Sequence, residues 1–318
     1  MSRADFDALV QRAMRSDEMT GLKPVIEKEL LHYEIFNAMD REGLLRGLVF
    51  QGGTSLRLCW GAERFSEDLD FAAGRDFDAE RMKPIKSCIE ELIGSRYGLP
   101  VRVKEPDWKR DKSTENVPVR TWLVSVMTSP GNPALPQQKI KIELAAVEAY
   151  TRQMVPIRKN YDFLEGTGTV LVPVESRDEI LADKIVAFPN SLFDRDGAPV
   201  DLESRKIRHR DVWDIAWLMR NRAQSSEELV ARKVADYGVP AFSDRLAYAL
   251  DALPRIVSGE AFGAQMSRFL DTQTYTRTVA EPQYLEYLGK AVRDVLETIQ
   301  AGRLAGEAEE EVGRGQSL

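Results

Sequence analysis

The chain of 318 residues is long enough for two lobes, each with its own hydrophobic core. Its hydrophobic content of 43% and charged content of 30% are typical of a soluble globular protein, and no apolar run approaches the length of a membrane span. The net charge of -7 argues against a protein that coats nucleic acid indiscriminately. We therefore expect a cytoplasmic protein with no membrane-spanning segment.

Hydrophobic periodicity predicts an α+β fold with two lobes. Residues 1–43 are expected to form two helices that pack on the core, and from Leu48 onward the pattern changes to short strands interrupted by one long helix. Residues 44–176 are therefore predicted to be a catalytic lobe built on a mixed sheet, and residues 177–306, whose segments repeat the helical period, a helical bundle. Residues 307–318, which include the acidic run EAEEE, are predicted to be disordered.

The segment GGTSLRLCWGAERFSEDLDF, residues 52–71, carries the strongest chemical signal. Glycines allow backbone N–H groups to close on a phosphate, and the start of a following helix adds partial positive charge. In a strand, Asp68 and Asp70 point to the same face while Leu69 points into the core. Two carboxylates on one face repel each other unless a cation lies between them, and Mg²⁺ carrying a nucleoside triphosphate is a suitable cation.

This segment predicts the residues of a nucleotide site. Backbone amides of the glycine turn, with Ser55, are expected to hold the triphosphate. Ser66 shares a face with the two aspartates, and Arg64 joins it if the strand extends back that far. The predicted nucleotide-binding residues are Gly52, Gly53, Thr54, Ser55 and Ser66.

Combined in this order, GGTSL and RFSEDLDF resemble the signature of the AbiEii/AbiGii-type, MenT-like nucleotidyltransferase toxins of abortive infection. The resemblance implies a nucleotidyltransferase fold in the sheet lobe. It also implies a toxin of a toxin–antitoxin pair that acts in phage defence, adds nucleotides to the 3′ end of tRNA and has a separately encoded antitoxin protein. The expected cofactor of the protein is Mg²⁺ or Mn²⁺, and the expected substrate is an NTP.

The strand QQKIKIELAAV supplies a candidate third metal ligand. Alternation puts Lys139, Lys141 and Glu143 on one face. If this strand lies next to the DLD strand, Glu143 joins Asp68 and Asp70 within the cross-strand spacing of about 5 Å that a shared metal site needs. The alternative is an amphipathic strand with a solvated face. Where Glu143 stands, the family often has aspartate.

The helix SRDEILADKIVAF brings a lysine onto an apolar stripe. Lys184 follows Ile180 and precedes Phe188 by one helical turn, so it must either extend its ammonium into solvent or meet an anion. The family resemblance implies the second alternative, with Lys184 binding the triphosphate. In the same family a segment like KIRHRDVWDIAWLM supplies an acidic residue beside that lysine. Asp211 is the first candidate for this role and Asp214 the second.

Local basic segments are compatible with an RNA acceptor for the transferred nucleotide. A structured RNA needs only a few phosphate contacts to be positioned, although such runs are also common on solvated faces. The alternatives to an RNA acceptor are a small-molecule nucleotidyltransferase of the antibiotic-modifying kind, which is expected to have a deep acidic pocket, and an inactive interaction module. The basic residues are Arg102, Lys104, Lys109, Arg110, Lys112, Arg152, Arg158, Lys159, Arg205, Lys206, Arg208, His209 and Arg210.

Overall fold

A computed structural model of the protein describes residues 5–14, 19, 21–108, 117–132, 134–165 and 168–315. The chain divides into two compact units, the first made of Met1–Ser176 with Arg268–Thr272 and the second of Arg177–Ser267 with Gln273–Leu318. A mixed sheet with many helices confirms the predicted α+β class. The predicted basic residues Lys109, Arg110 and Lys112 lie outside the described residues.

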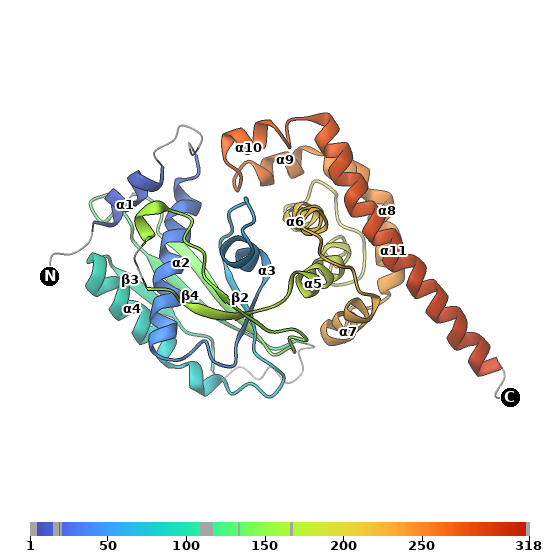
Figure 1. The fold of residues 1–318 in the computed structure, drawn as a ribbon, viewed down its shortest axis with the longest axis horizontal. Coiled ribbons are helices and arrows are strands. Elements are labelled where there is room, and N and C mark those ends of the chain that lie inside the picture. Colours follow the sequence, from blue (N-terminus) through green and yellow to red (C-terminus); the bar gives the residue numbers. More distant parts are fainter. Residues whose placement is uncertain are drawn as a thin grey trace. The chain divides into compact units, whose positions relative to one another are not determined.

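The first unit is built on a seven-stranded sheet of order β3-β4-β5-β2-β1-β7-β6. Figure 1 labels β2, β3 and β4 of this sheet. Strand β2 runs parallel to β5 and antiparallel to β1, and β1 runs parallel to β7. Strand β6 was not predicted because its side chains show no apolar alternation. The strands are β1 (Val49–Gln51), β2 (Leu69–Ala72), β3 (Val101–Lys104), β4 (Val119–Val126), β5 (Gln138–Ala145), β6 (Gln153–Pro156) and β7 (Leu171–Val174).

Helices α2 (Lys23–Arg41) and α4 (Pro84–Tyr97) pack together on one face of this sheet, where they also contact β5 and β3 (Figure 1). The core between them includes Phe36 of α2, whose ring meets the ring of Phe50 at 5.0 Å and that of Phe71 at 6.1 Å. Residues that alternate with this buried set therefore lie on the opposite face of the sheet. The shorter elements of the unit are α1 (Phe6–Ala13), α3 (Gly52–Ser55), a π-helical turn (Leu56–Trp60) and 3₁₀ turns at Ala79–Met82 and Asp162–Leu164.

The second unit is helical, and no strand pairs within its described residues apart from an isolated bridge between Phe193 and Pro199. Helix α5 packs on α6, α7 and α8, and α11 packs on α6 and α8. Helix α11 includes most of the segment for which composition predicts disorder. The helices are α5 (Arg177–Asn190), α6 (His209–Arg220), α7 (Glu227–Tyr237), α8 (Phe242–Ser258), α9 (Glu260–Met266), α10 (Thr272–Thr276), which begins at the unit boundary, and α11 (Pro282–Gly315).

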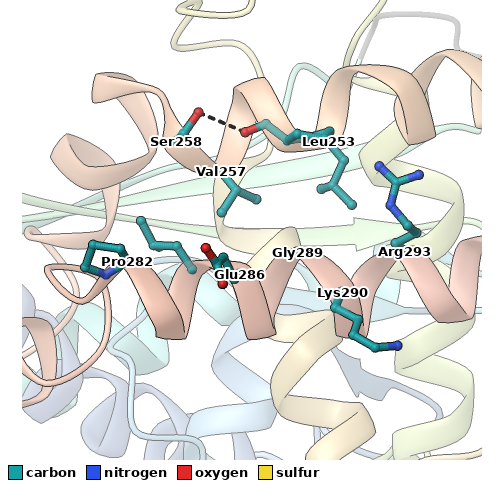
Figure 2. Close-up of a pocket in the computed structure, with 10 residues that line it drawn as sticks. Leu253, Val257, Ser258, Pro282, Glu286, Gly289, Lys290 and Arg293 are labelled. Carbon is teal, nitrogen blue, oxygen red and sulfur yellow. Dashed lines mark hydrogen bonds between the residues drawn. The ribbon is translucent and has the colours of Figure 1, made fainter.

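Helices α8 and α11 border a groove of about 470 Å³, shown in Figure 2. The groove is lined by the apolar side chains of Leu253, Val257 and Leu285 and by the cations Lys290 and Arg293. None of the site residues predicted from sequence lines it. Across the described part of the chain, every helix is too short or too polar to span a membrane.

Candidate active site

The glycine turn joins β1 to α3 in the first unit. Gly52 has a φ of +78°, a backbone conformation that residues other than glycine rarely adopt. A Cβ there would lie 2.7 Å from Oδ2 of Asp70. A Cβ on Gly53 would collide with the guanidinium of Arg64 and lie 3.2 Å from Oγ of Ser66. Gly52 therefore requires glycine, because of its φ and the close approach of Asp70, whereas a side chain at Gly53 would displace the guanidinium of Arg64.

Asp70 and Glu143 face each other across two neighbouring strands. The parallel register of β2 and β5 pairs Asp70 with Glu143, and the register of β1 and β2 pairs Asp70 with Gln51, directly before the turn. Both carboxylates are half-buried, and they lie on the face opposite to buried Leu69 and Ile142. Directly paired residues have Cβ atoms about 5 Å apart. The condition under which the sequence made Glu143 a partner of the DLD carboxylates, a KIKIEL strand beside the DLD strand, is thus met.

Asp68 stands just before β2 and is held by the neighbouring strand. The backbone N–H of Lys141 donates to Oδ1 of Asp68 at 3.1 Å. A carboxylate has two oxygens, so this bond leaves the second for another partner. The side chains of Asp68, Asp70 and Glu143 do not form a ready metal cage: in the described ranges no three His, Cys, Asp or Glu side chains are grouped to hold an ion. Mg²⁺ is usually bound by one or two carboxylates together with substrate phosphates, so the facing pair Asp70 and Glu143 fits it.

The hydroxyls of the turn donate to backbone carbonyls, one of the DLD segment and one of the turn itself. Thr54 donates to the backbone carbonyl of Asp68, and Ser55 donates to that of Gly52 at 2.7 Å. Both side chains are buried, at 1% and 0% exposure, so each hydroxyl is used within the protein. The backbone N–H groups of Thr54 and Ser55 therefore remain as the donors that these two residues can offer to a ligand.

Arg64 reaches the turn although it precedes the strand. Strand β2 begins at Leu69, so the condition on which the sequence put Arg64 on the aspartate face is not met. Its buried guanidinium nevertheless packs against Gly53 and donates from Nη1 to the carbonyl of Phe65 at 2.8 Å. Ser66, which is also buried, has its Oγ beside the same glycine. A positive charge therefore stands next to the glycine turn.

In the second unit, Lys184 of α5 forms a buried ion cluster with α6. Its Nζ lies 2.6 Å from Oδ1 of Asp211 and 3.0 Å from Oδ2 of Asp214. Lys184 is 4% exposed, so it meets anions and does not extend into solvent. The structure therefore brings both candidate acidic residues to the lysine.

Arg208 completes this cluster. It binds the second carboxylate oxygen of Asp211, and it comes from the loop directly before α6. Burial by itself raises the pKa of Asp211, but the charges of Arg208 and Lys184 outweigh burial and hold that pKa well below its ordinary value. Sequence reasoning missed this role because Arg208 stands in a basic run; its spacing of three residues before Asp211 was the available signal.

Comparison with solved structures shows which proteins share the fold. MenT4, a nucleotidyltransferase toxin from Mycobacterium tuberculosis H37Rv, has a similar fold: 19% identity, 91% of this chain and 89% of that chain covered, and a TM-score of 0.51. JHP933 from Helicobacter pylori matches over 90% of this chain and 97% of its own, with 17% identity and a TM-score of 0.47. The fold is thus that of a nucleotidyltransferase. No curated protein sequence matches the chain.

The family model described as "Nucleotidyl transferase AbiEii toxin, Type IV TA system" matches residues 35–298, most of the chain. The protein belongs to the AbiEii nucleotidyltransferase toxin family. This confirms the resemblance found in GGTSL and RFSEDLDF.

Proposed function

We propose that the protein transfers a nucleoside monophosphate from an NTP to the 3′ end of a tRNA. The 3′-oxygen of the RNA bonds to the α-phosphorus, the bond from that phosphorus to the bridging oxygen breaks, and pyrophosphate leaves while the hydroxyl proton passes to solvent. The observation that carries the proposal is the facing pair Asp70 and Glu143 beside a glycine turn, in a chain of a nucleotidyltransferase toxin family.

Enzymes of this kind generally use an NTP and divalent metal ions. The residues that would hold Mg²⁺, or Mn²⁺, are Asp70 and Glu143, with Asp68 as the third ligand. When bound, such an ion neutralises charge on the phosphates and lowers the pKa of an attacking hydroxyl. The two facing carboxylates repel each other without a cation, which supports this assignment.

The chain's own groups near Asp70 suit a triphosphate. The Gly52 to Thr54 turn has no side chain projecting from its glycines, so phosphate oxygens can approach the backbone N–H groups. The guanidinium of Arg64 next to Gly53 supplies a fixed positive charge. These groups act by positioning and electrostatic stabilisation, which supply most of the catalysis in phosphoryl transfer. A role for Lys184 in binding the triphosphate stays a prediction.

Membership of a toxin–antitoxin family implies an antitoxin partner. The proposed RNA acceptor distinguishes this protein from the antibiotic-modifying alternative, which uses the same carboxylates on a small molecule.

The test is incubation of the purified protein with total tRNA and each labelled NTP in Mg²⁺. We expect label in RNA with one or more NTPs, and at least about a 100-fold loss, equivalent to about 2.7 kcal/mol in the barrier, in Asp70→Asn and Glu143→Gln. Asp162→Asn, which changes an exposed acid of the same unit, is the matched control and should keep full activity. Transfer to aminoglycosides or other small molecules but not to RNA would refute the tRNA acceptor.

A further inference from the structure

Four cations lie on the sheet face that carries the carboxylate pair. The register pairs Arg102 of β3 with Ser125 of β4, and Ser125 with Lys139 of β5. The next row on this face pairs Lys104 with Leu123, and Leu123 with Lys141. Directly paired residues share a face, as do residues two apart in a strand, so the four cations form two rows. We call Arg102, Lys104, Lys139 and Lys141 the basic sheet surface.

The cations of the basic sheet surface are exposed, and among the described residues they form no ion pair. All four are exposed, while Val103 and Ile140 between them are buried on the opposite face. In the described part of the chain none of the four forms an ion pair; the nearby acid Glu105 lies 3.8 Å from Lys86 instead. Like charges on adjacent strands repel each other, so the surface is suited to an anion from outside.

The surface is also hollowed. A cavity of about 500 Å³ is lined by Arg102, Lys104, Ser125 and Lys139, with further residues in or directly before the same strands. Three of these four side chains are cationic, and the fourth is a hydroxyl that donates a hydrogen bond. The cavity therefore offers charge and hydrogen bonds to an anionic ligand, while Val101 and Leu123 add apolar contact.

The basic sheet surface continues directly into the candidate active site. Along β5, Lys139, Lys141 and Glu143 succeed one another on one face, at steps of about 6.6 Å. Glu143 in turn faces Asp70. A chain of regularly spaced anions that crosses the two rows in the direction of β5 therefore reaches the carboxylate pair.

We propose that the basic sheet surface binds successive phosphates of the acceptor RNA and directs its 3′ end toward Asp70 and Glu143. This inference rests on the proposed function. The repeated spacing of the cations matches a polymer with one negative charge per unit, and phosphate contacts of this kind position a nucleic acid without reading its sequence. An acidic protein segment is the competing occupant, and the experiment distinguishes the two.

The test reverses two charges that are remote from the carboxylates. Arg102→Glu/Lys139→Glu is compared with Arg46→Glu/Arg81→Glu, which makes the same change in net charge at two exposed arginines outside the strands of the same unit. RNA affinity is measured by fluorescence anisotropy with a labelled tRNA acceptor-stem hairpin at several salt concentrations. NTP affinity is measured by calorimetry, and thermal unfolding checks the fold.

We expect Arg102→Glu/Lys139→Glu to bind the hairpin at least about ten-fold more weakly and to lower the slope of log affinity against log salt by about two. The control pair should stay within about two-fold of the wild type, and NTP affinity should not change in either variant. Arg102→Ala/Lys139→Ala should show the same decrease in slope, which excludes an effect of newly introduced carboxylates.

Equal RNA affinity in the variant and the control pair would overturn the proposal, whether or not an acidic peptide binds the surface. If the wild type labels RNA and Arg102→Glu/Lys139→Glu labels it equally well, the surface assignment fails while the proposed function stands. If RNA binding is lost only in this variant but the wild type labels no RNA, the surface assignment stands and the proposed function fails.

Discussion

Lys184 and Asp211 are joined by an ion pair of 2.6 Å that is closed to water, with exposures of 4% and 2%. Asp214 lies 3.0 Å from the same ammonium, and Arg208 binds the other oxygen of Asp211. Two cations thus balance two buried carboxylates. Loss of one member leaves an uncompensated charge in a medium where charges are poorly solvated.

Replacement of Lys184 should therefore destabilise the protein. We expect Lys184→Met to lower the free energy of unfolding by about 3–5 kcal/mol, because Asp211 and Asp214 lose their shared partner. Lys290→Met is the matched control, since Lys290 forms an exposed pair with Asp294 in the same unit and should contribute less than about 1 kcal/mol. Urea unfolding measures both, and a loss below about 1 kcal/mol in Lys184→Met would contradict the buried cluster.

The predicted role of Lys184 toward the triphosphate needs a separate measurement. Lys184→Arg keeps the charge but changes the geometry of the donor, so it preserves more of the cluster than Lys184→Met. If Lys184 contacts the nucleotide, calorimetry should find NTP binding weakened by about 1–3 kcal/mol, the range for a charge-assisted contact. Unchanged NTP affinity in a folded variant would leave Lys184 as a structural residue only.

The glycine turn gives a sharper test of the site. Gly52→Ala should reduce nucleotidyl transfer by at least about 100-fold, because a methyl group 2.7 Å from Oδ2 of Asp70 must displace that carboxylate and also strains a φ of +78°. Gly94→Ala is the control: its Cβ meets nothing within 4 Å, and alanine favours the helix α4. The measurement is the steady-state rate of nucleotidyl transfer at saturating NTP in both variants and the wild type. Full activity in Gly52→Ala would mean that Asp70 does not act beside the turn.

Local sequence patterns sufficed for the elements that carry the site. Glycines after an apolar strand, and aspartates that alternate with Leu69 and Phe71, reflect constraints within a few residues of each other. The partner of Asp70 was predicted only conditionally, because strand order depends on which long-range pairing buries the most apolar surface. The register of β2 and β5 settles that condition and brings Glu143 opposite Asp70.

Contacts between distant segments explain what the sequence did not reveal. Arg64 was predicted to share the aspartate face only if the strand extended back to it; the strand begins at Leu69, yet the guanidinium lies beside Gly53. Thr54 and Ser55 stay predicted ligand contacts, and the structure adds that their hydroxyls donate to backbone carbonyls inside the protein. Arg208 looked like part of a solvated run. The positions of Arg64 and Thr54 depend on tertiary neighbours that no periodicity encodes, whereas the partners of Ser55 and Arg208 lie three residues away along the chain.

His32 makes the stability of the protein sensitive to mild acid. It is 1% exposed, its Nε2–H donates to the carbonyl of Glu67 at 3.0 Å, and its Nδ1 has no hydrogen-bond partner in the described structure. Burial lowers its pKa from 6.5 to about 4, against the opposing effect of the Glu67 carbonyl. A depressed histidine pKa means that the unfolded chain binds the proton more tightly, so stability is full above pH 6.5 and declines as the pH falls toward about 4.

We expect the wild type to lose about 3 kcal/mol more than His32→Gln between neutral pH and pH 4, the linkage value of such a shift. The glutamine amide retains a donor for Glu67 but does not titrate. Urea unfolding of both proteins at several pH values isolates this residue, because the carboxylates that titrate in the same range are common to both. Parallel stability profiles would show that His32 contributes nothing to the acid sensitivity.

The basic run before α6 provides the last prediction, which separates an RNA acceptor from a small molecule. Arg205 and Lys206 are exposed, whereas Arg208 binds the buried carboxylate of Asp211. Reversal of Arg208 would disturb the Lys184 cluster, so only Arg205→Glu/Lys206→Glu tests phosphate contact. If the acceptor is tRNA, this variant should lower transfer at subsaturating RNA by about ten-fold, and the pair Arg46→Glu/Arg81→Glu should change it much less.

Wild-type transfer should also fall roughly ten- to a hundred-fold between about 50 and 200 mM salt, because a few phosphate contacts release their counterions. NTP affinity should be the same in all three proteins, since the proposed triphosphate contacts at Gly53 and Arg64 are unaltered. A rate that is insensitive both to salt and to the Arg205 and Lys206 reversals would remove the electrostatic basis for a tRNA acceptor and favour a small-molecule substrate.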